Sequence, residues 1–127
     1  MRTIIALVLL VTIDTARAQE NALAKIGLSG IGATSCSQVI ANYRKRQPDQ
    51  QKAMFGVIYL SWAQGFMSGI NKGNDAMNKP VKNLQAWSPS AQTEHLMAFC
   101  DKNSSKLFVT AAFDLFYALP EFAESKR

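Results

Sequence analysis

The sequence has little of what most enzymes use. Its 127 residues include one histidine, His95, and two cysteines, Cys36 and Cys100. A single histidine excludes a metal site built on two histidines of one chain. The acidic residues are scattered, and the close pair Glu121 and Glu124 lies at the chain end, a poor place for acid–base catalysis. No glycine-rich phosphate loop and no CxxC motif is present. We therefore expect a protein that is not an enzyme, with no catalytic residues, cofactor or metal.

The first 18 residues have the pattern of a secretory signal peptide. Arg2 is followed by an apolar run over residues 4–13 and by the small-x-small tripeptide of residues 16–18. The apolar run is too short to cross a bilayer as a mature helix. An uncleaved anchor is the alternative. We predict cleavage after Ala18 and a periplasmic or secreted protein.

The two cysteines are the only ones in the chain. In an oxidising compartment an even number indicates a disulfide, here Cys36–Cys100, with two buried free thiols as the alternative. The bond would close a loop of about 65 residues, which the chain-entropy model values at about 4 kcal/mol. For so small a domain, that contribution decides whether the chain stays folded.

The chain carries a formal net charge of +5, but its basic residues are spread along the sequence. Proteins that read nucleic acid concentrate positive charge on one face and interleave it with aromatic residues. The scattered pattern is instead typical of a solvated surface, with weak attraction to anionic surfaces as the alternative. We expect no nucleic-acid partner.

Apolar residues recur at helical spacing, and no strand pattern of useful length is present. The expected helices cover residues 36–47, 49–71, 88–100 and 104–119. Thr34 or Ser35 caps the first, Ser88 the third and Asn103 the fourth, which Pro120 ends. The inward positions of the last two are expected to be Leu96, Phe99, Cys100, Phe108, Ala112, Leu115 and Leu119. Phe113 and Phe116 are expected to widen the inward stripe of the last helix.

The predicted fold is therefore all-α, a small bundle of about four helices with one disulfide after a cleaved signal peptide. Its predicted organisation is a signal peptide (1–18), a flexible lead-in (19–33), a helical domain (34–120) and a tail (121–127).

The second helix has the strongest pattern in the sequence. One face carries Phe55, Tyr59, Trp62, Phe66 and Ile70. Residues 53–70 hold no charge, a length that would also fit a short transmembrane helix. Glutamine, serines and glycines within the run favour a helix buried among the others, with no stable membrane insertion. We interpret the aromatic face as part of the protein core. The alternative is that it binds a small ligand, which would make the protein a carrier.

A second stripe of the same helix consists of small residues. Ser61, Gly65 and either Ser68 or Gly69 follow helical spacing beside the aromatic face. Small side chains let another backbone come close, so the stripe predicts a tight helix crossing.

Two further features are candidates for function. The irregular stretch 72–87 contains Met77 and Trp87, residue types that interfaces favour, and they are the candidate partner surface.

Asp114 lies within an apolar helix. It is either a solvent-facing carboxylate or a partly buried one that senses acid.

Three segments carry a resemblance to known proteins: "SCSQVI", "YLSWAQGFMSGIN" and "HLMAFCDKNSSKLFVTAAFDLFYALP". Their order resembles the small periplasmic Tai-type immunity proteins and is similar to the Hde-type acid-stress chaperones, over about residues 35–120. Both are exported all-α folds with one disulfide of this placement. Residues 101–104 depart from the immunity pattern, where a proline-containing stretch is common. The shortage of carboxylates departs from the chaperones.

The two families imply different partners. Immunity proteins of the first type block a peptidoglycan-cleaving amidase delivered by a type VI secretion system. Chaperones of the second type cover aggregating clients in acid. The expected function is a protein-binding module of the immunity type, with the chaperone as the alternative. The expected partner is a secreted effector or an envelope client, and a homodimer stays open.

Overall fold

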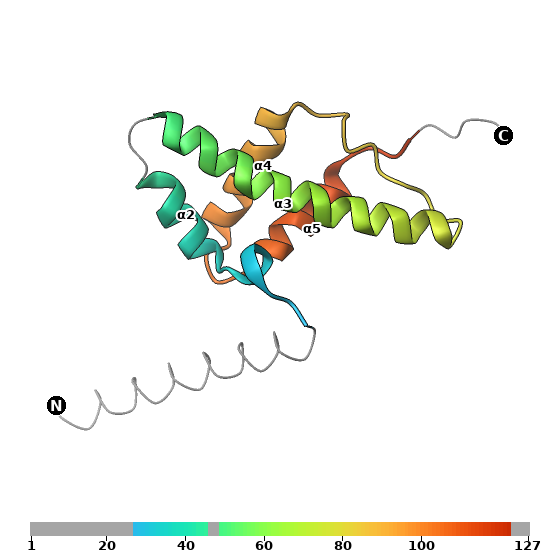
Figure 1. Cartoon of the computed structure of the whole chain (residues 1–127), viewed down its shortest axis with the longest axis horizontal. Helices are drawn as coiled ribbons and strands as arrows, with labels where there is room; N and C mark the ends of the chain where they lie inside the picture. Colours follow the sequence, from blue (N-terminus) through green and yellow to red (C-terminus); the bar gives the residue numbers. More distant parts are fainter. Residues whose placement is uncertain (1–26, 46–48, 123–127) are drawn as a thin grey trace, which may run out of the picture. The chain divides into compact units, whose positions relative to one another are not determined.

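The computed structural model describes residues 27–45 and 49–122. A short 3₁₀ helix and four α-helices follow one another along these ranges: η1 (Gly30–Ala33), α2 (Cys36–Arg44), α3 (Asp49–Ala76), α4 (Pro89–Lys102) and α5 (Phe108–Ala118) (Figure 1). Extended pairing within the described ranges is limited to two isolated bridges. The prediction of an all-α fold with four helices is confirmed. The predicted signal peptide lies outside the described residues.

The chain divides into two units, Met1–Gly30 and Ile31–Arg127. Only residues 27–30 of the first are described, and Gly27 and Gly30 there have φ angles of 64° and 67°. The second unit contains the four α-helices. Within it, α3 and α4 each pack against the other three helices.

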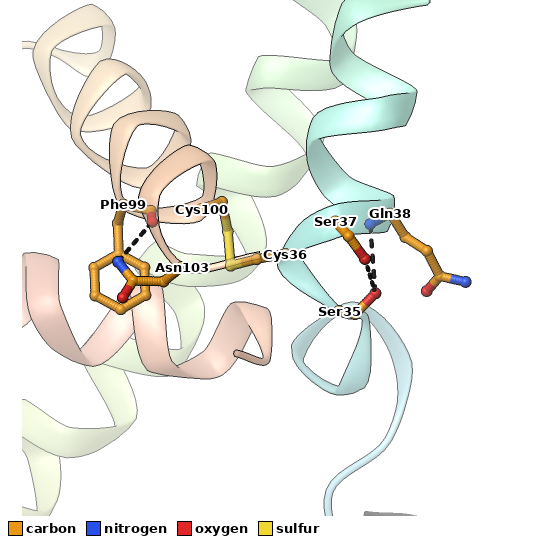
Figure 2. The surroundings of a disulfide bond; sticks show 7 residues. All are labelled: Ser35, Cys36, Ser37, Gln38, Phe99, Cys100 and Asn103. Carbon is orange, nitrogen blue, oxygen red and sulfur yellow. Dashed lines mark hydrogen bonds between the residues drawn. A yellow bond between two sulfur atoms is a disulfide. The ribbon is translucent and has the colours of Figure 1, made fainter. Parts of the chain in front are cut away.

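The predicted disulfide joins the start of α2 to the last turns of α4, at Cys36 and Cys100 (Figure 2). Both cysteines are fully buried. The chain beside Cys36 also pairs with the segment that leads into α5. The Cys36 N–H donates to the Lys106 carbonyl at 2.8 Å, and the Phe108 N–H donates to the Thr34 carbonyl at 2.8 Å. Covalent and backbone bonds therefore hold α2, α4 and the start of α5 together.

The core is apolar and is built from all four α-helices. Its fully buried members include four residues of the stripe predicted for the last helix, Phe108, Ala112, Leu115 and Leu119. Leu96 and Cys100 of α4 are also fully buried, as predicted. Phe99 is only partly buried and packs at the edge of this core. Of the two phenylalanines expected to widen the stripe, Phe116 is buried, whereas Phe113 is 39% exposed and lies outside the core.

The predicted end of the second helix is wrong. α3 continues past Asn71 to Ala76, and Gly73 lies inside it. The left-handed residue that ends the helix is Asn78, with φ 54°. Its N–H and that of the following residue donate to carbonyls of the last turn, at 3.0 and 2.8 Å. These two bonds form a Schellman motif, in which asparagine takes the position that glycine usually fills.

The predicted start of the last helix is also wrong, because α5 begins at Phe108 with Leu107 as its N-cap. Asn103 instead ends α4, where its side-chain Nδ2 donates to the Phe99 carbonyl at 2.9 Å (Figure 2). The segment between is engaged in backbone pairing with the start of α2, so it is not free to become helical. α2 likewise ends at Arg44, three residues before its predicted end.

The small-residue stripe of α3 does not form the predicted helix crossing. A Cβ added at Gly65 or Gly69 would meet nothing within 4 Å. α3 is therefore buried along one side only, and its outer side exposes Met54, Val57 and Ile58. No helix within the described ranges combines the length and apolar character that a membrane span requires.

Close approach of another helix occurs instead at Gly56. A Cβ there would lie 3.2 Å from Cγ2 of Thr93 on α4. At that distance the Thr93 methyl group must give way by a few tenths of an ångström, and the hydrogen bond that Thr93 Oγ1 donates to the Pro89 carbonyl at 2.9 Å holds the side chain in place.

These environments make Gly56 and Gly65 a matched pair for one prediction. We expect Gly65→Ala to raise the free energy of unfolding by about 0.5–1 kcal/mol, because alanine is the better helix former and its methyl group has room. Gly56→Ala should lower it by about 1 kcal/mol, since overpacking against Thr93 outweighs the same gain. Urea unfolding followed by circular dichroism measures both. A Gly65→Ala variant less stable than wild type would contradict the open stripe.

Candidate functional site

An open depression runs along one side of α4 and the loop residue that precedes it. It is lined by Trp87, Ala91, Glu94, His95 and Ala98, and its volume is about 530 Å³. Positions 91, 94, 95 and 98 are adjacent or spaced by three or four residues, so they share one face of α4, and Trp87 precedes them in the loop. The two alanines leave the hollow between the larger side chains. We call this site the α4 depression.

A buried glutamine holds Trp87 at the α4 depression. The Nε2 of Gln92 donates to the carbonyls of Leu84 and Trp87, at 2.8 and 2.9 Å. Its Oε1 accepts from Nε2 of Gln64 on α3 at 3.3 Å. The hydroxyl of Ser88 caps α4 by accepting from a backbone N–H at 3.2 Å, as predicted. The loop end and the helix start are therefore one hydrogen-bonded unit.

This arrangement predicts that Gln92→Met destabilises the protein although the side-chain volume is kept. The carbonyls of Leu84 and Trp87 would lose their donor in a partly buried place. Each unpaired buried group costs about 1–3 kcal/mol, so we expect the free energy of unfolding to fall by about 2–3 kcal/mol. Urea unfolding measures it, with the exposed Gln85→Met as control, expected within about 0.5 kcal/mol of wild type. Equal stabilities of the two variants would contradict the role of Gln92.

The single histidine pairs with the aspartate singled out in the sequence. Nε2 of His95 lies 2.7 Å from Oδ2 of Asp114, across the contact of α4 with α5. The side chains are 27% and 49% exposed. The Asp114 carboxylate accepts this hydrogen bond from the N–H at Nε2 of His95. Asp114 is thus half-exposed and paired, and its role as an acid sensor stays a prediction.

His95 also supports the tryptophan. Its ring centroid lies 5.6 Å from that of Trp87, with the two planes tilted by 58°. His95 and Trp87 therefore form one wall of the α4 depression, and Asp114 on α5 orients His95 from outside the lining. The sequence offered no signal for this arrangement, because the spacing between positions 95 and 114 does not show which helix faces will meet.

Glu94 has an unusual position among the carboxylates. Within residues 27–45 and 49–122, those that form ion pairs are Asp75, Asp101, Asp114 and Glu121. Of the other two in these ranges, Asp49 lies in the first turn of α3, where the helix dipole favours a negative charge. Glu94 has neither kind of compensation. An unpaired carboxylate therefore lines the α4 depression of a basic chain.

The predicted partner residues Met77 and Trp87 lie at opposite ends of one loop. The loop runs from the end of α3 to the start of α4 (Figure 1). Met77 is exposed just beyond α3, whereas Trp87 is partly buried against the core. The loop between them is held to α3, since Asn71 exchanges two hydrogen bonds with the backbone of Lys82, at 2.7 and 2.8 Å. Only Trp87 belongs to the α4 depression.

Comparisons with protein-family models, with curated proteins and with solved structures found no match for this chain.

Proposed function

We propose that the protein is a non-enzymatic, exported module that binds another protein through the α4 depression. One observation carries this proposal: a partly exposed indole, Trp87, shares an open hollow with the unpaired carboxylate of Glu94. Tryptophan is among the residues that most often dominate binding energy at protein interfaces. The disulfide supports a periplasmic or secreted location, because such bonds persist in oxidising compartments.

The partner we propose is a cell-wall amidase effector, which makes the protein an immunity-type inhibitor. The support is the order of the three sequence segments that resemble Tai-type immunity proteins. The bond between Cys36 and Cys100 joins the first of these segments to the last. That connection agrees with the disulfide placement that the resemblance implies.

Replacement of Trp87 tests the proposal. We expect Trp87→Ala to weaken binding to an amidase effector from the same organism by about 30-fold, which corresponds to about 2 kcal/mol. Met77→Ala is the control, since it removes an exposed apolar side chain at the far end of the loop, and it should change affinity less than about twofold. Calorimetry gives the affinities, and peptidoglycan hydrolysis gives the inhibition. Unchanged binding by Trp87→Ala contradicts the site, and absence of binding to amidase effectors contradicts the partner.

A second candidate is an Hde-type chaperone, which the outer side of α3 favours. Met54, Val57 and Ile58 are exposed together there, and an exposed apolar patch can cover an aggregating client. In acid, the wild type should then suppress light scattering by a client more than a Val57→Ser, Ile58→Ser variant does. No suppression by the wild type removes this candidate.

A further inference from the structure

We infer that the α4 depression is a binding site for one cationic side chain, the guanidinium of an arginine on the partner protein. This inference rests on the proposed function and names the chemistry of the partner residue. It joins three observations: an unpaired carboxylate, an aromatic ring beside it, and a hollow that small residues leave open.

The negative charge at the α4 depression favours a positively charged binding group. Glu94 lines the α4 depression and forms no ion pair within the described residues, and Oδ2 of Asp114 lies 2.7 Å from Nε2 of His95. Among the described residues that line the depression there is no lysine or arginine. An anion would be repelled here, and a purely apolar group would desolvate the Glu94 carboxylate without pairing it. A cation would instead form a charge-assisted hydrogen bond with it.

The indole of Trp87 and the two small alanines of the α4 depression determine which kind of cation fits. A cation above an indole face is attracted by the ring quadrupole, and tryptophan is the best of the aromatic residues for this interaction. A guanidinium is planar, so it can stack on Trp87 while its N–H groups point sideways to Glu94. The alanines at 91 and 98 leave space for the aliphatic stem. The compact, strongly hydrated ammonium of lysine cannot make both contacts equally well.

The openness of the α4 depression indicates that the occupant belongs to a protein. Sites for free small molecules enclose most of the ligand surface. This depression opens broadly to solvent and is walled mainly by one face of α4 and Trp87. An occupant must therefore be held by further contacts outside the hollow, as a side chain of a docked protein would be.

Two short peptides test the inference on the full, disulfide-bonded protein. Acetyl-Gly-Arg-Gly-amide is compared with the same peptide carrying citrulline, which has a closely similar shape and no charge. Binding is followed by the NMR signal of the Trp87 indole N–H, assigned with Trp87→Phe. We expect a saturable shift with the arginine peptide, with a Kd on the order of 1 mM, and binding of the citrulline peptide about tenfold weaker.

Two variants then test whether the arginine peptide contacts the carboxylate of Glu94. Glu94→Gln should weaken the arginine peptide by about tenfold, because it removes the charge and keeps the shape. Asp49→Asn is the matched control, since within the described ranges Asp49 is the other carboxylate without an ion pair, and it should leave affinity unchanged. Equal binding of the two peptides, or full binding by Glu94→Gln, overturns the inference.

The peptide experiment is independent of the test of the proposed function. If an amidase effector loses affinity for Trp87→Ala but not for Glu94→Gln, the proposed function stands and the inferred arginine-binding site is wrong. If the arginine peptide binds as expected but amidase effectors do not, the inferred arginine-binding site is correct and the proposed partner is wrong.

Discussion

Replacement of both cysteines, Cys36→Ala with Cys100→Ala, is expected to lower the free energy of unfolding by about 4 kcal/mol. The bond links residues 64 positions apart, and its loss returns the entropy of that loop to the unfolded chain. Domains of this size are stable by about 5–15 kcal/mol, so the loss is a large share of the total. Urea unfolding followed by tryptophan fluorescence measures the change.

Reduction provides the control for this prediction. Dithiothreitol should bring the wild type down to about the stability of the double variant and should leave the double variant unchanged. Alanine is used because both positions are fully buried and a serine hydroxyl there would need a new partner. Equal stability of the wild type with and without reductant would show that the bond does not stabilise the fold.

Phe108→Ala is expected to lower the free energy of unfolding by about 3–5 kcal/mol. Among the described residues, Phe108 is the largest side chain that is fully buried. Its ring lies 5.1 Å from that of Tyr59 and 5.8 Å from that of Trp62, which joins α5 to α3. Truncation removes apolar burial and these ring contacts together, and leaves a cavity between the two helices.

Tyr117→Ala is the matched control on the same helix. Tyr117 is 70% exposed, and we expect its truncation to cost less than about 1 kcal/mol. Both variants are compared with wild type by urea unfolding. Similar losses for the two would contradict the placement of α5, because they would mean that its inner and outer sides contribute equally.

Much of the fold could be predicted because the signals are local. Helical periodicity identified the inward stripe of α5, and Ser35 and Ser88 cap their helices through side-chain bonds to N–H groups within three residues. The number of cysteines and the expected compartment predicted the disulfide. Each of these inferences depends on nearby residues or on a count.

The errors occurred where distant residues decide the local structure. α3 passes Gly73, and Asn71 within it holds the backbone of Lys82 in the loop. α5 starts late because the Phe108 N–H donates to Thr34, far back in the chain. Helix ends leave backbone groups unpaired, so the partner that reaches them determines where the helix stops.

The sequence by itself determined the helices, the core faces and the disulfide, since periodicity, capping and cysteine parity act locally or by number. Only the tertiary structure decided the site. Packing of α4 against α5 set His95 against Asp114, and the buried Gln92 bonds the carbonyl of Trp87, which lines the same depression as Glu94. The small-residue stripe of α3 stayed open for the same reason: spacing shows which residues share a helix face, but not which other helix will cover it.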